Sequence, residues 1–378
     1  MDMFIELFTN RFSRVDFQRH DLDVFEYQFD SFYDRNKIPH GIFSLDIVDL
    51  SYSTARTLCS YHLSEKELYF DVIASMLSHL NFIDSTHTNF LLSESRYKRL
   101  RDFSKSTRIG EMAQGINTLF VGRKLNFPYI IDFDLAKEKT QTTLNIQTRG
   151  KTPDFVFLDI TSTKLGLFES KGTMNGRVSG KRGYLSKAME QIDNVYNPCF
   201  EYAAPVCIKF EDNNDVNLDS IPSDRKSSIN YALSEIECTN LQDLRLLKKL
   251  HYASWFYLIG DFDRVDAILN EGIVIPIQDE NDPIYFLDVD TDKDNPIFWV
   301  REEYNFALTP NEKNNIPIAY FSAGFWFENE MRIGIYQKAI ENLYNTNEVD
   351  INFELPESNV NYLRKYPDGT LIYLKNNQ

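Results

Sequence analysis

The sequence predicts an α/β (α+β) protein in which helices pack on a β-sheet. Between residues 108 and 210, segments with helical spacing of apolar residues alternate with shorter segments rich in β-branched and aromatic residues. Of the 378 residues, 43% are hydrophobic and 14% are aromatic, which is typical of a folded protein rather than a disordered one. A chain of this length can bury a sizeable core and form two or three domains.

The first element of this region is a predicted helix over residues 108–122. Its apolar residues recur at three- and four-residue steps from Ile109 to Leu119. Ser106 or Thr107 is available as its N-cap. Glu111 lies beside the apolar stripe, and Gly115, one turn further on, leaves its face uncrowded.

Strand-like segments follow. Residues 129–135 are predicted to form the first strand of the core, with Asp132 and Asp134 on a solvent-facing edge. Residues 153–171 contain two further apolar runs separated by a polar turn, which predicts a β-hairpin.

The hairpin carries a constellation of charged residues. Because side chains alternate along a strand, Glu169 and Lys171 point to one face and Ser170 points to the other. Asp154 begins the first run, so the hairpin can place two carboxylates and one ammonium group around a single point. Two carboxylates that lie so close repel each other, and at neutral pH a bound divalent cation usually neutralises their charge. This arrangement predicts attack on a phosphodiester.

A loop, a helix and a strand complete the order of elements. The loop over residues 172–183 contains four glycines, which favour a mobile connector, and its cations suit backbone phosphates. The helix over residues 184–196 carries Lys187 and Gln191 on a polar face. Residues 205–210 supply the closing strand.

Basic residues concentrate around this hairpin. The chain holds 40 Lys and Arg against 56 Asp and Glu, a net charge of −16 that argues against a nucleic-acid binder. Residues 96–187 hold 18 basic and 8 acidic residues, a net charge of +10. The rest of the chain holds 22 basic and 48 acidic residues, a net charge of −26. A basic island in an acidic protein indicates attraction of a polyanion. The candidate nucleic-acid contacts are Arg99, Arg101, Arg177, Lys181, Arg182 and Lys187.

Composition excludes several other classes. The four cysteines show no CxxC or Cys/His clustering, which disfavours a zinc site or a disulfide framework and fits a reducing cytoplasm. No stretch approaches eighteen apolar residues, so no membrane partner is expected. The first residues carry acids where a signal peptide needs cations.

The sequence Pro153-Asp154, followed by Glu169-Ser170-Lys171 on a hairpin between two helices, resembles the PD-(D/E)xK nuclease superfamily, the restriction-endonuclease-like fold. The resemblance covers residues 95–215. It implies a central mixed β-sheet flanked by helices. The chain then divides into an N-terminal accessory domain (1–92), the nuclease core (93–215) and an acidic C-terminal accessory or recognition domain (216–378).

The resemblance also implies the chemistry. Asp154, Glu169, the Ser170 carbonyl and Glu111 would hold Mg²⁺, for which Mn²⁺ can substitute. Lys171 would orient the attacking water and stabilise charge on phosphorus, and Gln191 would support the site. The expected enzyme is therefore a Mg²⁺-dependent nuclease that hydrolyses phosphodiester bonds.

A free-standing member with extra domains on both sides resembles cytoplasmic endodeoxyribonucleases of prokaryotic restriction or anti-phage defence. Restriction-type members commonly dimerise, so a homodimer or a partner protein bound through the flanking domains stays open. Three alternatives to a DNA endonuclease also stay open. They are an RNase, a structure-specific DNA repair nuclease of the same fold, and a non-catalytic nucleic-acid-binding scaffold.

Overall fold

The computed structural model describes residues 19–28, 37–69, 82–84, 87–161, 164–196, 200–213, 225–235, 244–277, 284–286, 297–300, 330–344 and 363–375. The chain divides into two compact units, Phe17–Ser254 and a second unit that joins Met1–Asp16 to Trp255–Gln378. Among the described residues, no helix combines the length and the apolar character needed to cross a membrane.

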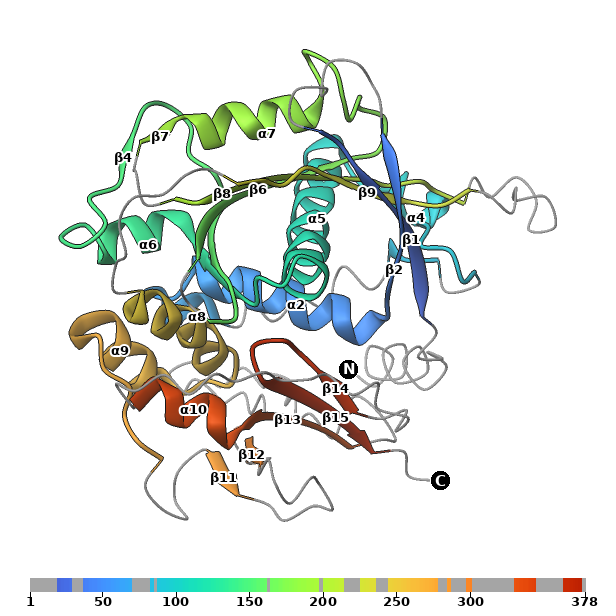
Figure 1. Cartoon of the computed structure of the whole chain (residues 1–378). Helices are drawn as coiled ribbons and strands as arrows, with labels where there is room; N and C mark the ends of the chain where they lie inside the picture. Colours follow the sequence, from blue (N-terminus) through green and yellow to red (C-terminus); the bar gives the residue numbers. More distant parts are fainter. Residues whose placement is uncertain are drawn as a thin grey trace. The chain divides into compact units, whose positions relative to one another are not determined.

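The larger unit is built on a central mixed sheet with the strand order β2-β1-β9-β8-β6-β5-β3 (Figure 1). Its parallel pairs are β6 with β8 and β1 with β9, and the other pairs along this order are antiparallel. The predicted α/β class with a mixed sheet and flanking helices is therefore confirmed. The strands of the sheet are β1 (His20–Glu26), β2 (Ile38–Leu45), β3 (Tyr129–Asp132), β5 (Phe155–Leu158), β6 (Leu165–Thr173), β8 (Tyr202–Lys209), β9 (Ser228–Tyr231) and β10 (Ser234–Glu235), which pairs with β8.

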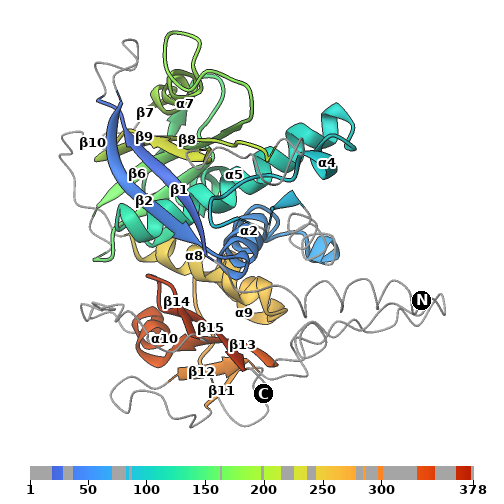
Figure 2. The same cartoon turned by 90° about the vertical axis from the view of Figure 1, so that its right-hand side faces the viewer.

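The strands come from all three predicted domain ranges. β1 and β2 belong to residues 1–92, and β9 and β10 follow residue 215. β1 and β2 lie side by side at one edge of the sheet (Figure 2). The predicted nuclease core thus shares its sheet with segments from both flanks.

Helices cover both faces of this sheet. The helices of the unit are α2 (Ile47–Tyr61), α4 (Glu94–Tyr97), α5 (Asp102–Lys124), α6 (Phe133–Lys139) and α7 (Tyr184–Asp193). α7 packs on one face against β6 and β8, whereas α5 packs on the opposite face and α2 packs against α5 (Figure 1). A short separate ladder joins β4 (Gln147–Thr148) to β7 (Val195–Tyr196).

Some predicted boundaries are wrong, and the helix predicted over residues 184–196 ends at Asp193, before β7. α5 begins at Asp102 rather than after Ser106 or Thr107, and its N-cap Arg101 makes no side-chain capping bond. Asp102 complements the helix dipole in the first turn, which favours the earlier start. The predicted strand over residues 129–135 ends at Asp132, because the Asp132 carboxylate accepts a hydrogen bond from the Leu135 N–H at 2.9 Å and caps α6.

β3 is an edge strand, and two of its outward N–H groups donate hydrogen bonds to side chains. The Ile130 N–H donates to His251 Nδ1 at 3.1 Å, and the Asp132 N–H donates to Ser60 Oγ at 3.1 Å. Asp132 is partly buried, which corrects its predicted solvent-facing position. These contacts remove a template for edge-to-edge pairing with another chain.

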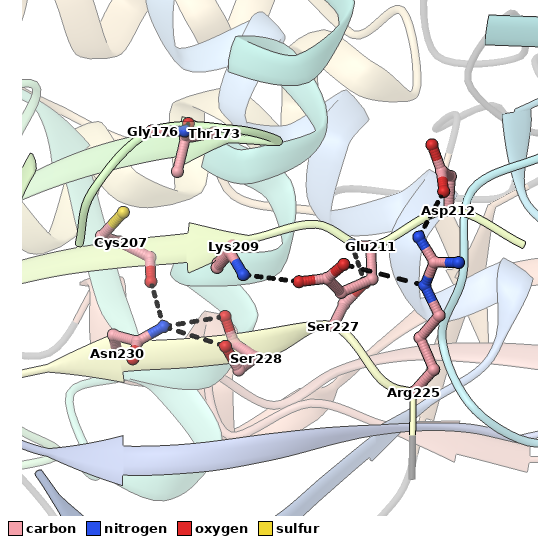
Figure 3. A network of polar contacts seen from close by, with 10 residues as sticks. All are labelled: Thr173, Gly176, Cys207, Lys209, Glu211, Asp212, Arg225, Ser227, Ser228 and Asn230. Atoms are coloured by element: carbon pink, nitrogen blue, oxygen red, sulfur yellow. Dashed lines mark hydrogen bonds and ion pairs between the residues drawn. The ribbon is translucent and has the colours of Figure 1, made fainter. Parts of the chain in front are cut away.

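Ion pairs fasten the end of β8 to the segment before β9 (Figure 3). Glu211 Oε1 lies 2.6 Å from Lys209 Nζ, and Glu211 Oε2 lies 3.8 Å from Arg225 Nε. Arg225 Nη2 also donates to Asp212 Oδ1 at 2.7 Å. The charge of Lys209 is therefore balanced locally, two residues beyond the position of β8 that pairs with Lys171.

The second unit contains an antiparallel sheet with the strand order β11-β12-β13-β15-β14. Its elements are α9 (Phe262–Glu271), β11 (Ile284–Phe286), β12 (Ile297–Val300), β13 (Glu330–Tyr336), α10 (Gln337–Tyr344), β14 (Leu363–Lys365) and β15 (Thr370–Lys375). α8 (Arg245–Leu258) spans the boundary between the two units.

Replacing Gly172 with alanine should destabilise the larger unit. A Cβ atom at Gly172 would lie 2.6 Å from Ala113 Cβ and 2.8 Å from the Ile109 carbonyl oxygen, so α5 would have to move away from β6. We expect Gly172→Ala to cost about 1–3 kcal/mol of unfolding free energy in urea denaturation. Gly110→Ala is the matched control: a Cβ atom at Gly110 would meet no other atom within 4 Å, and the change should stabilise α5 by about 0.5–1 kcal/mol. Equal effects of the two changes would contradict the close approach.

Candidate active site

The hairpin formed by β5 and β6 brings Asp154 and Glu169 together. Phe155 pairs with Phe168 at the open end of the hairpin, so the next residues, Asp154 and Glu169, face each other. The Asp154 N–H donates to Glu169 Oε2 at 2.7 Å, and the Ser170 N–H donates to Asp154 Oδ2 at 3.0 Å. Each carboxylate is therefore held by the backbone of the opposite strand.

Lys171 and Gln191 complete the cluster from the side of α7. Lys171 Nζ contacts Glu169 Oε1 and donates to Gln191 Oε1 at 2.7 Å. Gln191 Nε2 donates in turn to the Thr152 carbonyl oxygen at 2.7 Å. The structure thus brings together four of the predicted catalytic residues, from β6, α7 and the segment before β5.

Electrostatics make the two acids costly to ionise. The pKa of Glu169 is raised to about 8, mainly by burial and secondly by the Asp154 carboxylate, while Lys171 opposes the shift. Burial likewise raises the pKa of Asp154, which Lys171, the Ser170 N–H and the Gln114 side chain lower. The Glu169 side chain is 0% exposed and that of Lys171 is 23% exposed, so the ammonium group is the wetter side of the pair.

Helix α5 contributes differently from the prediction. Glu111 Oε2 lies 3.1 Å from Arg108 Nη1. The residue of α5 that hydrogen-bonds to Asp154 is Gln114, one turn further along the helix. Sequence reasoning missed Gln114, although its three-residue spacing from Glu111 places the two side chains on one helix face.

The polar groups of Ser170 face two neighbours: its hydroxyl group faces α5, and its main-chain N–H faces Asp154. Its hydroxyl oxygen accepts from Asn117 Nδ2 at 2.9 Å on the α5 side, so the side chain points away from Lys171 Nζ, as strand alternation predicts. The N–H and C=O of one strand residue point to the same side, and the Ser170 N–H points to Asp154. The Ser170 carbonyl is therefore directed toward the acidic pair.

These donors fit a Mg²⁺ ion. Within the described residues, no three His, Cys, Asp or Glu side chains form a cluster able to hold a metal ion. Mg²⁺ prefers oxygen ligands and is usually held by one or two carboxylates while it keeps several waters and binds substrate phosphates. Asp154, Glu169 and the Ser170 carbonyl match that limited donor set, and Glu111 stays a predicted ligand.

The predicted nucleic-acid contacts are all exposed. In the part of the chain that the structure describes, none of the six cations forms an ion pair with a carboxylate, in contrast to Lys98, Lys105 and Arg108 nearby. Lys187 Nζ lies 4.9 Å from the centre of the Tyr184 ring. The six unpaired cations are Arg99, Arg101, Arg177, Lys181, Arg182 and Lys187.

The glycine-rich loop between β6 and α7 makes several hydrogen bonds within itself and to α7. The Gly176 N–H donates to Thr173 Oγ1 at 2.7 Å. The Tyr184 and Leu185 N–H groups donate to the carbonyl oxygens of Arg177 and Val178 at 2.9 and 3.0 Å. The loop therefore satisfies N–H groups at the start of α7, and the mobility of this connector stays a prediction.

Comparison of this chain with protein-family models, with curated proteins and with solved structures finds no match in any of the three. The resemblance to PD-(D/E)xK nucleases therefore depends on the residues and their geometry alone.

Proposed function

We propose that the protein is a metal-dependent nuclease that hydrolyses phosphodiester bonds. The observation that supports this proposal most directly is the meeting of Asp154, Glu169 and Lys171 on one hairpin, with Gln191 holding the ammonium group. Buried acids with raised pKa values beside a lysine are typical of catalytic sites.

In this proposal each residue has a distinct task. Asp154, Glu169, the Ser170 carbonyl and Glu111 would hold Mg²⁺ or Mn²⁺, which supplies charge neutralisation at the phosphate and a water of lowered pKa. The Lys171 ammonium group stabilises negative charge that grows on the phosphoryl oxygens. Gln191 orients that ammonium group through the 2.7 Å hydrogen bond.

DNA is the proposed substrate, and the unpaired cations are its proposed phosphate contacts. Arg101 occupies the N-cap position of α5, where a positive charge opposes the helix dipole, and a bound phosphate would relieve that opposition. By resemblance, we place the enzyme among cytoplasmic endonucleases of prokaryotic restriction or anti-phage defence.

A cleavage assay tests the proposal. Purified protein is incubated with supercoiled plasmid, linear duplex, branched DNA, single-stranded DNA and RNA, in Mg²⁺, in Mn²⁺ and in EDTA. We expect cleavage of DNA that EDTA abolishes. Cleavage of RNA alone would favour the RNase alternative, cleavage confined to branched DNA would favour a repair nuclease, and binding without cleavage would favour a scaffold.

Charge reversal in the loop should weaken nucleic-acid binding uniformly across sequences. We expect Lys181→Glu/Arg182→Glu to reduce the slope of log K against log salt by about 1–2, because each phosphate contact contributes about 0.9. Lys124→Glu/Lys139→Glu makes the same change in charge at the end of α5 and on α6. Fluorescence anisotropy at several salt concentrations measures both, and an equal loss of slope would remove the loop from the interface.

A further inference from the structure

Helix α5 presents two amide side chains to the catalytic hairpin. Gln114 hydrogen-bonds to the Asp154 carboxylate, and the bond lowers the pKa of that acid, so the amide N–H is the donor. Asn117 is 0% exposed, and its Nδ2 lies 2.9 Å from Ser170 Oγ and 3.3 Å from the Lys171 carbonyl oxygen. Both amides thus act on the motif from the face opposite α7.

The hairpin needs such support at this point. β5 begins at Phe155, which pairs with Phe168, so residues of β6 beyond Phe168 have no partner on β5. At Ser170 the Asp154 carboxylate replaces the missing strand partner, because it accepts a hydrogen bond from the Ser170 main-chain N–H at 3.0 Å. A carboxylate that replaces a ladder bond must itself be held, because a free rotamer would leave both the strand and the acid without a fixed geometry.

Asn117 indicates that this support is more than packing. Its Oδ1 is buried without a hydrogen-bond partner, and an unpartnered buried acceptor is destabilising. An apolar residue of similar size would fill the same space between α5 and β6 without that cost. The amide is therefore explained by its two donated bonds to the motif rather than by the stability of the helix contact.

Amides also suit the electrostatics of the site. A third carboxylate beside Asp154 and Glu169 would raise the pKa of both acids further by repulsion. An amide donor stabilises the ionised acid without adding charge.

We propose that Gln114 and Asn117 are positioning residues that fix the Asp154 carboxylate and the Ser170–Lys171 backbone in the geometry that receives a divalent cation. This inference rests on the proposed nuclease function. It names the residues of α5 that prepare the site for its cation, and neither side chain needs to contact the cation itself.

Mn²⁺ titration followed by electron paramagnetic resonance tests the inference without requiring activity. In Gln114→Met, and separately in Asn117→Leu, the Kd for Mn²⁺ should rise about 10–100-fold, as for other residues that orient metal ligands. Cleavage by Gln114→Met should recover to within about threefold of wild type at saturating Mn²⁺.

Asn230→Leu is the matched control. Asn230 is also a buried amide but lies on β9, and its Nδ2 donates to the carbonyl oxygens of Cys207 and Ser228 at 3.3 and 3.1 Å (Figure 3). Its loss should lower the unfolding temperature and leave the Kd for Mn²⁺ unchanged within about twofold.

The outcomes separate the two proposals. If wild-type protein binds Mn²⁺ and cleaves DNA while both α5 variants bind with wild-type affinity, the positioning role is overturned and the nuclease stands. If wild-type protein neither binds Mn²⁺ nor cleaves any nucleic acid, the nuclease proposal fails and the positioning role fails with it. A similar rise in Kd in Asn230→Leu would also overturn the positioning role, because it would show a general loss of sheet order.

Discussion

Lys171→Ala should abolish DNA cleavage while DNA binding stays largely intact. The Lys171 ammonium group contacts both Glu169 and Gln191, and the Lys171 side chain is more exposed than that of Glu169. A positioned cation that stabilises charge developing on a transferred group contributes about 10²–10³-fold to rate. We expect a loss of at least that size in single-turnover cleavage, with a Kd for duplex DNA within about threefold of wild type.

Removal of Lys171 also leaves Glu169 without its cation, so stability must be followed in parallel. Lys171→Met keeps the length of the aliphatic stem and should lose cleavage to the same extent. Lys209→Ala is the control, because Lys209 lies on the neighbouring strand and is paired with Glu211 rather than with Asp154 or Glu169 (Figure 3). Cleavage retained within a factor of a few in folded Lys171→Ala would remove Lys171 from the mechanism.

The local geometry of the hairpin was predictable because it depends on strand alternation alone. Glu169 and Lys171 share a face and Ser170 turns away from them, as a period of two residues requires. Gln191 contacts Lys171 because α7 crosses that face. The roles of these residues in catalysis stay predictions.

Other features depend on contacts that no local pattern contains. Gln114 could be identified only with the knowledge that α5 packs against β6. Glu111 lies on the same helix face, and its carboxylate is the more usual metal ligand, so the sequence favours Glu111. Asp132 has neighbours typical of a strand, yet its carboxylate caps α6 and ends β3. β1 pairs with β9 across about 200 residues of sequence, and pairing at that range is set by tertiary packing rather than by propensity.

Glu169→Gln should abolish cleavage and also flatten the pH dependence of stability in metal-free protein. The pKa of Glu169 is raised to about 8 in the folded chain, above its ordinary value of 4.5, mainly by burial. Between these values the folded state binds a proton that the unfolded state has lost. The contribution of Glu169 is therefore fully present below about pH 4.5 and is lost as the pH rises through 8, at about 1.4 kcal/mol per pH unit for one proton.

The two proteins are compared by urea denaturation in EDTA from pH 5 to pH 9. Wild-type protein should lose stability more steeply with pH than Glu169→Gln, whereas Glu190→Gln, an exposed change on α7, should keep the wild-type slope. Mg²⁺ should reduce the slope of the wild type, because a bound cation favours the ionised acids, and should have no such effect on Glu169→Gln. Parallel slopes for wild type and Glu169→Gln would show that Glu169 does not carry the raised pKa. The same substitution thus tests whether the carboxylate that is costly to ionise in the metal-free fold is also the one that, in the proposed function, attracts the cation.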